Sequence, residues 1–291
     1  MRIAVLTDSN SGMTPEDARE NGIELMSMPI FINGKSYMEN VDITQEQFYE
    51  YLRQDANVST SQPSVGEMQD EFDRLLKSYD SIVFIPMSAG LSGTCQTAAM
   101  LAQDYDGKVQ VVNNHRISVT QRQSALDAKL LADKGADPVE IREKLEADAG
   151  NSSIYITVET LKYLKKGGRI TPAAAAIGTL LNIKPVLQIQ GEKLDSYAKS
   201  RGMVSARKIM LKAVHLDLQN RFPEADKAGR IHIAGAYTAD RETTAGWIKQ
   251  VQDEFPQYPV HFDPLPVSIG CHIGHGSLAV TVSSFLPDRE K

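Results

Sequence analysis

Hydroxylated residues and glycines directly follow an apolar run in the stretch SIVFIPMSAGLSGT, residues 81–94. The run Ile82–Ile85 predicts a buried parallel strand, and 94–105 predicts a helix. A strand-to-helix turn presents hydroxyls and backbone N–H groups at the carboxyl edge of a sheet, where open α/β proteins bind ligands. Gly93 lets the backbone approach a ligand, and Ser92 adds a hydroxyl donor. We expect a site for a small anion or polar head group, although a helix N-cap followed by a tight turn gives the same pattern.

A second hydroxyl-rich segment, TSQPS, occupies residues 60–64. Ser64 and Glu67 have the spacing of a capping box, so Ser64 is expected to cap the helix that follows. Thr60 and Ser61 lie outside this box and are the available hydroxyl ligands. Because that helix leads into the strand before Ser92, both hydroxyl-rich segments are expected beside one sheet.

Strand and helix patterns alternate through the first half of the chain, which predicts right-handed crossovers and a mostly parallel sheet. Strands are expected at 2–6, 23–31, 82–85 and 109–112, and helices at 44–53, 64–76, 94–105 and 118–134. Two further helices are expected to begin at Thr14 and Asp137. Asp8, after the first strand, is interpreted as a carboxylate that holds loop N–H groups rather than as a catalytic acid. Asp17 is expected to complete the cap formed by Thr14.

A domain boundary is expected at 149–153, which divides the chain into an N-terminal α/β domain, 1–150, and a C-terminal α+β domain, 151–291. Later elements are expected as strands at 154–158, 230–237, 260–262 and 278–283, a hairpin of 183–190 with 194–199, and helices at 161–166, 204–222 and 241–255. A further helix is expected to begin with Thr171 as its cap. The glycine-rich stretch 269–277 is interpreted as a loop. The predicted fold class is α/β in two domains.

Composition limits the classes of function. The chain has 291 residues, 42% hydrophobic and 23% charged, as expected for a soluble globular protein. A formal charge of -6 argues against nucleic-acid binding. Cys95 and Cys271 provide neither a disulfide framework nor metal-ligand spacing, and no cofactor is expected. The first residues read as a strand rather than a signal peptide, so we expect a cytoplasmic protein.

Five short motifs together resemble the bacterial DegV family, in the family's order and over nearly the whole chain. They are TDSNSG at 7–12, TSQPS at 60–64, SAGLSGTCQ at 88–96, KKGGRI at 165–170 and GCHIGHGS at 270–277. The chain departs from the family pattern after the histidine, where Gly274-His275-Gly276 replaces an expected Gly-Pro-Gly-like turn.

The resemblance implies a fatty-acid-binding protein that is not itself an enzyme. It would present a long-chain fatty acid to a separate ATP-dependent fatty acid kinase, which phosphorylates the acyl carboxylate, with transient membrane contact for lipid exchange. The residues that the resemblance assigns to the carboxylate are Thr60 or Ser61, Ser92 with Gly93, and His272. Arg169 would serve phosphotransfer or contact the kinase; its other interpretation is an arginine that bonds the last carbonyls of the preceding helix.

The physical chemistry of a fatty acid agrees with such a site. An ionised carboxylate is costly to bury without partners, so hydroxyls, N–H groups and an imidazole suit it. Burial of about fifteen methylenes offers on the order of 12 kcal/mol as an upper bound, so the tail would dominate affinity. A tunnel between or beside the domains is expected. The small-residue run 173–181 is a candidate lining, although ordinary core packing explains it better.

Three rival functions fit less well. A serine hydrolase would use Ser92 as nucleophile and His272 as base, but 90–94 is not a G-x-S-x-G elbow. A phosphate- or nucleotide-binding enzyme lacks a Walker lysine and a G-x-G-x-x-G motif. A transcriptional regulator disagrees with the acidic charge. Metal binding by His272 and His275 is not expected, because Cys271 is the one other potential metal ligand close to them in the sequence.

Overall fold

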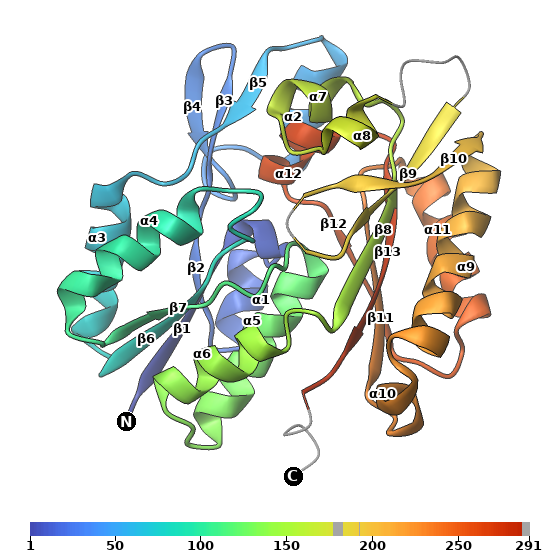
Figure 1. Ribbon diagram of the computed structural model, residues 1–291. Coiled ribbons are helices and arrows are strands. Elements are labelled where there is room, and N and C mark those ends of the chain that lie inside the picture. Colours follow the sequence, from blue (N-terminus) through green and yellow to red (C-terminus); the bar gives the residue numbers. More distant parts are fainter. Residues whose placement is uncertain (177–182, 192, 287–291) are drawn as a thin grey trace. The chain divides into compact units, whose positions relative to one another are not determined.

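The computed structural model of the chain describes residues 1–176, 183–191 and 193–286. The chain divides into two compact units, Met1–Gly150, here called unit 1, and Asn151–Pro287, here called unit 2 (Figure 1). Unit 1 contains a parallel sheet flanked by helices, whereas unit 2 contains a mixed sheet. The predicted α/β class in two parts is therefore confirmed.

The parallel sheet of unit 1 has the strand order β2-β1-β6-β7. Its strands are β1 (Ile3–Asp8), β2 (Glu24–Met26), β6 (Ser81–Ile85) and β7 (Val109–Val111). The helices are α1 (Pro15–Glu20), α2 (Gln45–Arg53), α3 (Val65–Leu76), α4 (Thr94–Leu101), α5 (Val119–Asp133) and α6 (Pro138–Ala147). The chain continues from β1 to opposite sides, first to β2 and later to β6, so a topological switch point lies at this strand.

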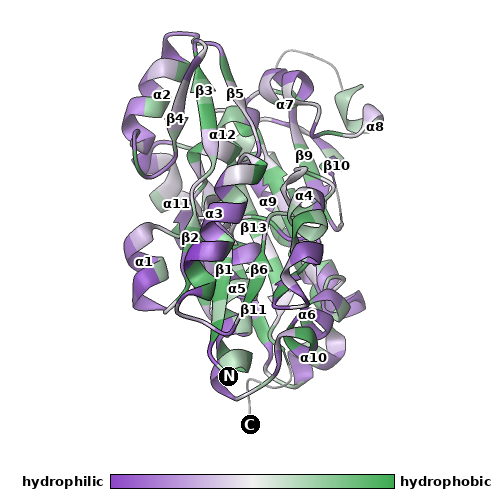
Figure 2. Ribbon diagram, turned by 90° about the vertical axis from the view of Figure 1, so that its left-hand side faces the viewer, coloured by the Kyte–Doolittle hydropathy of each residue, from purple (hydrophilic) through white to green (hydrophobic). Residues whose placement is uncertain are grey.

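Apolar side chains at helical spacing bury the faces of this sheet. Met68, Phe72 and Leu75 on α3 are buried against β1 and β6. Phe72 meets Phe84 of β6 edge to face, with ring centroids 5.9 Å apart. Helices α3 and α4 cover one face and α5 and α6 the other (Figure 1), and the strands β1 and β6 are among the most hydrophobic segments in Figure 2.

A second, small sheet in unit 1, of order β4-β3-β5, differs from the sequence prediction. The apolar run 23–31 is divided between β2 and β3 (Pro29–Ile32), because the backbone N–H of Met28 turns to the hydroxyl of Ser9 (3.0 Å) and Pro29 has no N–H. A turn at Asn33-Gly34, with φ of 51° and 81°, joins β3 to β4 (Lys35–Met38). β5 (Val58–Thr60) then pairs with β3.

The mixed sheet of unit 2 has the order β10-β9-β8-β13-β11-β12, in which β11 and β12 are parallel and the other pairs antiparallel. Its strands are β8 (Ser152–Thr157), β9 (Ile183–Ile189), β10 (Asp195–Arg201), β11 (Ile231–Tyr237), β12 (Val260–Pro264) and β13 (Leu278–Ser284). The helices are α7 (Lys162–Gly167), α8 (Pro172–Ala175), α9 (Met203–Asn220), α10 (Pro223–Lys227), α11 (Arg241–Glu254) and α12 (Val267–Ile273). The predicted hairpin of β9 and β10 is present.

Helices α9 and α11 pack on the mixed sheet and form the core of unit 2. Trp247 of α11 is completely buried there, and its indole Nε1–H donates to the carbonyl oxygen of Ala279 on β13 at 3.0 Å. Met210 and Val214 of α9 belong to the same buried cluster. The core thus combines apolar burial with a satisfied indole N–H.

The glycine-rich stretch 269–277 was expected to be a loop. Its first part is instead helical, because Val267–Ile273 forms α12. Pro266 precedes its first residue, and Gly274, at φ 77°, ends it. The buried apolar residues of this helix outweigh the low helix propensity of Gly270. The prediction of a loop was wrong because glycine content was weighted above burial.

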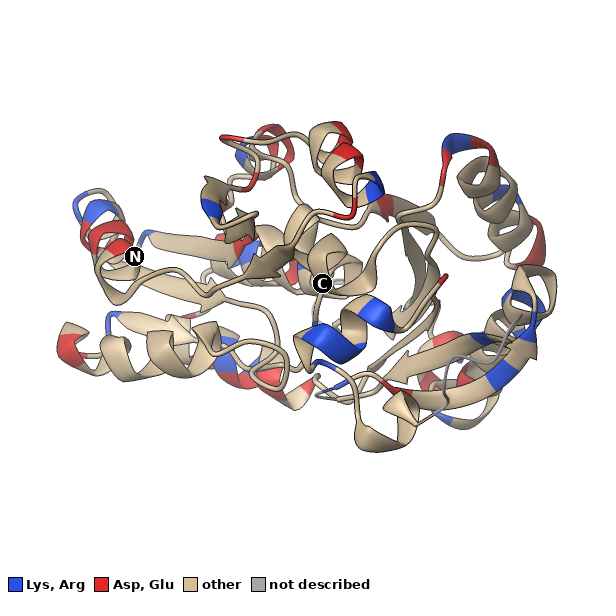
Figure 3. Cartoon of the chain, turned by 90° about the horizontal axis from the view of Figure 1, so that it is seen from above, with Lys and Arg blue, Asp and Glu red and all other residues tan. Residues whose placement is uncertain are grey.

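Charged residues of both signs occur in both units. Lys, Arg, Asp and Glu residues are distributed over many of the helices (Figure 3). Within the described residues, no helix has the length and apolar character needed to span a bilayer.

Candidate functional site

The turn before α4 presents two hydroxyls side by side. Ser92 Oγ and Thr94 Oγ1 are 2.9 Å apart, and the N–H of Thr94 donates to Ser92 Oγ at 3.3 Å. Gly93 is the N-cap residue of α4 and provides no side-chain cap. The hydroxyls therefore lie at the positive end of a helix, where an anion is favoured.

The TSQPS segment contacts this turn through Gln62. The Nε2 of Gln62 donates to Thr97 Oγ1 of α4 at 3.0 Å. A Cβ atom at Gly93 would lie 2.5 Å from Gln62 Oε1, so a larger residue at this position would displace the amide. Gln62 is a residue that the sequence reasoning missed, because its partner is 35 residues away. It joins the two hydroxyl segments of unit 1.

The remaining residues of that segment have separate tasks. Ser64 and Glu67 form the predicted capping box at α3, with the N–H of Ser64 donating to Glu67 at 2.7 Å. Ser61 Oγ donates to the carbonyl oxygen of Gln62 at 2.6 Å. Thr60 is the last residue of β5 and pairs with Ile30. Ser64 is thus committed to the helix, as expected, while Thr60 and Ser61 lie in the extended chain before it.

Asp8 anchors the loop that leads to Ser92. Its buried carboxylate accepts hydrogen bonds from the N–H of Met87 (3.0 Å), the N–H and the side-chain amide of Asn10 (3.1 and 3.0 Å) and Nε2 of Gln121 (2.9 Å). Burial raises the pKa of Asp8 above its ordinary value, although these donors act in the opposite direction. The observed bonds match the interpretation of Asp8 as a carboxylate that holds loop N–H groups.

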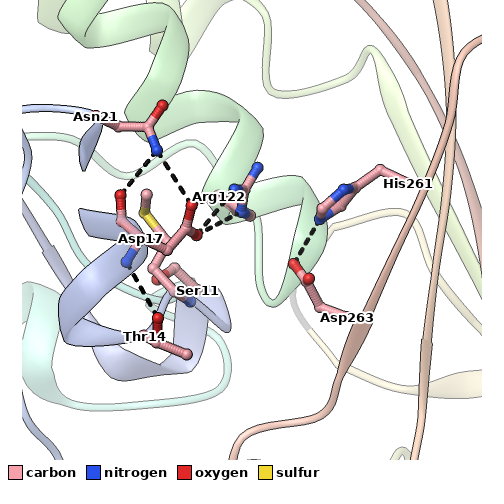
Figure 4. Close-up of polar contacts among 8 residues, drawn as sticks. Ser11, Thr14, Asp17, Asn21, Arg122, His261 and Asp263 are labelled. Carbon is pink, nitrogen blue, oxygen red and sulfur yellow. Dashed lines mark hydrogen bonds and ion pairs between the residues drawn. The ribbon is translucent and has the colours of Figure 1, made fainter. Parts of the chain in front are cut away.

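An ion pair fixes α5 against α1 in the same unit. Thr14 caps α1, because its hydroxyl accepts from the N–H of Asp17 at 3.1 Å (Figure 4). The Asp17 carboxylate does not accept the reciprocal bond from the N–H of Thr14. It accepts instead from Arg122 of α5 at 2.7 Å, in a bidentate contact. The expected reciprocal cap was therefore wrong, because a partly buried guanidinium is a stronger partner than a backbone N–H.

In unit 2, His272 of α12 packs directly on α7. A Cβ atom at Gly167 would overlap its imidazole ring, so this close approach requires glycine. Burial, and secondly the charge of Arg169, lower the pKa of His272 to about 4. The imidazole is therefore neutral near pH 7 and has one N–H donor and one acceptor.

Arg169 lies on the short connection between α7 and α8. Its guanidinium donates to the carbonyl oxygen of Gly167, the bond expected from its simpler interpretation. Its backbone oxygen accepts from the N–H of Leu194 at 3.3 Å, and the N–H of Thr171 donates to the Leu194 carbonyl oxygen at 2.9 Å. The loop is thus fixed to the chain beside β10, which holds Arg169 near His272.

The candidate residues form two internally connected sets. The set called the hydroxyl set comprises Thr60, Ser61, Ser92 and Gly93 in unit 1, and the set called the Arg–His set comprises Arg169 and His272 in unit 2. That both surround one head group stays a prediction. Of the proposed lining 173–181, Ala174 is buried and residues 177–181 lie outside the described residues.

The rival functions gain nothing from the local geometry. Ser92 is hydrogen-bonded to Thr94, and the His272 ring abuts Gly167. Cys95 and Cys271 are buried free thiols. Among the residues whose positions are described, no cluster of three His, Cys, Asp or Glu side chains could hold a metal ion.

Comparisons with known proteins cover almost the whole chain. The family model described as "Uncharacterised protein, DegV family" matches residues 2–284. A DegV domain-containing protein of Listeria innocua is 30% identical over 286 residues, which is 97% of this chain and 98% of that protein. One from Deinococcus radiodurans is 33% identical over 207 residues, which is 71% of this chain and 74% of that protein.

Two solved structures agree closely with the fold. The structure described as fatty acid binding of a DegV family protein from Thermus thermophilus has a TM-score of 0.88 and 28% identity, and covers 98% of this chain and 100% of that chain. DegV of Bacillus subtilis, described as a fatty acid binding protein, has a TM-score of 0.85 and 28% sequence identity. The match covers 98% of this chain and 100% of that chain. Since the family model spans residues 2–284 and the Listeria relative is matched along nearly its full length, the chain belongs to the DegV family.

Proposed function

We propose that this protein binds a long-chain fatty acid and holds its carboxylate at the hydroxyl set. The observation that carries the proposal is the full-length likeness, at 28% identity, to two DegV proteins described as fatty acid binding. The local geometry adds support, because Ser92 and Thr94 place two hydroxyls at the start of α4. The protein is a binding protein in this proposal and not an enzyme.

The chemistry of each set suits one part of the task. A carboxylate needs donors, and the Ser92 and Thr94 hydroxyls, the first N–H groups of α4 and Thr60 or Ser61 can supply them. His272 is proposed as a further contact, since a neutral imidazole donates one hydrogen bond without adding a buried charge. Tail burial would supply most of the affinity, whereas the head-group contacts set the orientation.

We further propose that the bound carboxylate is presented to a separate ATP-dependent fatty acid kinase. Arg169 is the candidate contact for the acyl phosphate or for an acidic surface of the kinase, because its backbone is anchored and a guanidinium matches phosphate oxygens. Because the kinase needs ATP, we propose that the two proteins meet in the bacterial cytoplasm. This protein would contact the membrane transiently when lipid is exchanged.

The proposal is tested first on the ligand and then on the partner. Denaturing mass spectrometry of freshly purified protein should release a fatty acid, and delipidated protein should bind C14 to C18 fatty acids saturably in calorimetry. Absence of saturable binding would refute the central claim. Binding without acyl phosphate formation, when ATP and a fatty acid kinase are added, would refute only the partnership.

A further inference from the structure

We propose that unit 2 contains a second ligand site, for the phosphate group of a small phosphomonoester. A pocket of about 300 Å³ is lined by residues at the end of α9 and the start of α10 and by residues at the ends of sheet strands. Figure 1 shows where α9 is followed by α10. The lining residues that carry the argument are Asn151, Asn220, Arg221, Phe222, Arg230 and Ser284. This site is independent of the proposed fatty acid function, and it shares no residue with either candidate set.

The pocket is basic although the chain as a whole is acidic. Two arginines, Arg221 and Arg230, are among its lining residues. Glu224 also lines it, but its side chain is 81% exposed and its carboxylate pairs with Lys227 at 2.8 Å. In a chain of net charge -6, two guanidinium groups around one cavity favour an anion there. Planar guanidinium forks match the oxygens of a phosphate.

Arg221 is held in place by a buried polar network. Its guanidinium donates to Ser153 Oγ and lies over the ring of Phe222, 5.0 Å from the centroid. Asp217, which is 5% exposed, lies 3.7 Å away and accepts the hydroxyl of Tyr155 at 2.7 Å. Because the side chain is ordered before a ligand arrives, little rotamer entropy is lost on binding.

Arg230 has no carboxylate partner among the described residues. It donates to the carbonyl oxygen of Phe285 at 3.1 Å, and it has no ion pair with any of the described residues. Its backbone N–H donates to Ala225 at 2.8 Å, which fixes the start of the side chain beside α10. A ligand phosphate would therefore gain from Arg230 without breaking an existing ion pair, whereas Arg221 already has Asp217.

The size of the pocket indicates which kind of phosphate fits. Its volume of about 300 Å³ corresponds to roughly ten water molecules at about 30 Å³ each, more than a bare phosphate ion fills. Pro223 is partly exposed and also lines the wall, so an organic group can contact apolar surface there. The geometry therefore favours a phosphomonoester over inorganic phosphate.

The test is titration of the full-length protein with inorganic phosphate, glycerol phosphate and adenosine monophosphate, followed by calorimetry and by amide chemical shifts. Wild type should bind at least one ester saturably and more tightly than phosphate, with the largest shifts within 220–230 and at Ser284. Arg230→Gln should weaken ester binding at least tenfold, about 1.4 kcal/mol. Lys212→Gln removes the same charge from an exposed position of α9 outside the pocket lining, and it should change ester affinity less than about twofold, below roughly 0.4 kcal/mol.

Each alternative result counts against the site. No saturable binding of any probe, or equal losses in Arg230→Gln and Lys212→Gln, would show solvated surface charge rather than a built pocket. Phosphate binding as tightly as both esters would overturn the phosphomonoester assignment. Asn220→Ala is a second variant with a milder change and should also weaken the ester. Fatty acid binding, measured on the same samples, should be unchanged, so failure of either function is seen separately.

Discussion

The hydroxyl set of unit 1 and the Arg–His set of unit 2 are built by different means. The hydroxyl set lies where strands end and helices begin. The atom closest to a side chain built at Gly93 is the amide oxygen at the end of the flexible Gln62 side chain. The Arg–His set depends on two packed helices, α7 and α12, with an imidazole ring against the backbone of Gly167. The first arrangement can adjust to a substitution, whereas the second has little freedom to do so.

The difference also concerns electrostatics. The hydroxyls of Ser92 and Thr94 are neutral at all ordinary pH values, so the first set should be insensitive to acid. His272 has its pKa lowered to about 4 by burial and by Arg169, so the second set is sensitive to acid. Four substitutions can break or sharpen this comparison, and they are taken from the largest expected effect to the smallest.

The largest effect is expected for Gly167→Ala. The new methyl group would overlap the His272 ring, and we expect a loss of about 3 kcal/mol in the free energy of unfolding. Gly168→Ala places a side chain at φ 70° in open space and should cost about 1 kcal/mol. Gly93→Ala, in unit 1, displaces only the Gln62 amide and should also cost about 1 kcal/mol. Urea denaturation measures all three, and equal losses would contradict the contrast.

The second effect is the acid response of His272. The unfolded chain takes up the histidine proton near pH 6.5 and the folded protein only near pH 4, so the free energy of unfolding falls as pH decreases through this window. The loss is up to about 2.5 kcal/mol, since the group is not fully shielded from water. His272→Asn should remove this pH dependence, while the exposed His275→Asn should keep it. If wild type and His272→Asn lost stability equally with decreasing pH, His272 would not be the group responsible for the acid response.

The third effect concerns the ligand. Ser92→Ala removes one hydroxyl of the pair with Thr94 and should weaken fatty acid binding by about 2 kcal/mol, since the tail keeps most of the affinity. Acyl phosphate formation should fall further than binding, because the reacting oxygen is no longer held in position. Ser64→Ala is the matched control: it removes a helix cap and should lower stability without lowering affinity. An unchanged affinity of Ser92→Ala would move the carboxylate elsewhere.

The smallest effect is expected for Arg169→Ala. Fatty acid affinity should stay nearly intact, while kinase-dependent acyl phosphate formation should fall about tenfold, or about 1.4 kcal/mol. The assay needs the kinase, ATP and variant protein preloaded with fatty acid. Arg201→Ala, at the end of β10, is a control for simple loss of charge. Unchanged turnover would assign Arg169 to local contacts such as its observed bond to Gly167 rather than to phosphotransfer.

What the sequence could predict is mostly local. The capping boxes of Thr44 with Gln47 and of Ser64 with Glu67 are both present, because such caps depend on residues three apart. The parallel sheet and the β9–β10 hairpin follow from periodicity and turn residues in the same way. These features require no knowledge of contacts between distant segments.

What the sequence could not predict depends on distant partners. Gln62 bonds to Thr97 across 35 positions, and Asp17 pairs with Arg122 across 105. Gly167 contacts His272, whose residue number is also higher by 105. The helix α12 was missed for a related reason, because its burial against α7 outweighs its glycine content. Short patterns carry no information about these contacts.

The single tryptophan of the chain gives the molecule a built-in optical reporter. Trp247 is fully buried within unit 2 and donates its indole N–H to Ala279, so its emission should be blue-shifted until that core opens. Unit 1 contains tyrosines but no tryptophan. Fluorescence therefore follows the opening of unit 2 alone, whereas circular dichroism follows the helices of both. A melt in which the two signals separate would reveal that the units unfold one after the other.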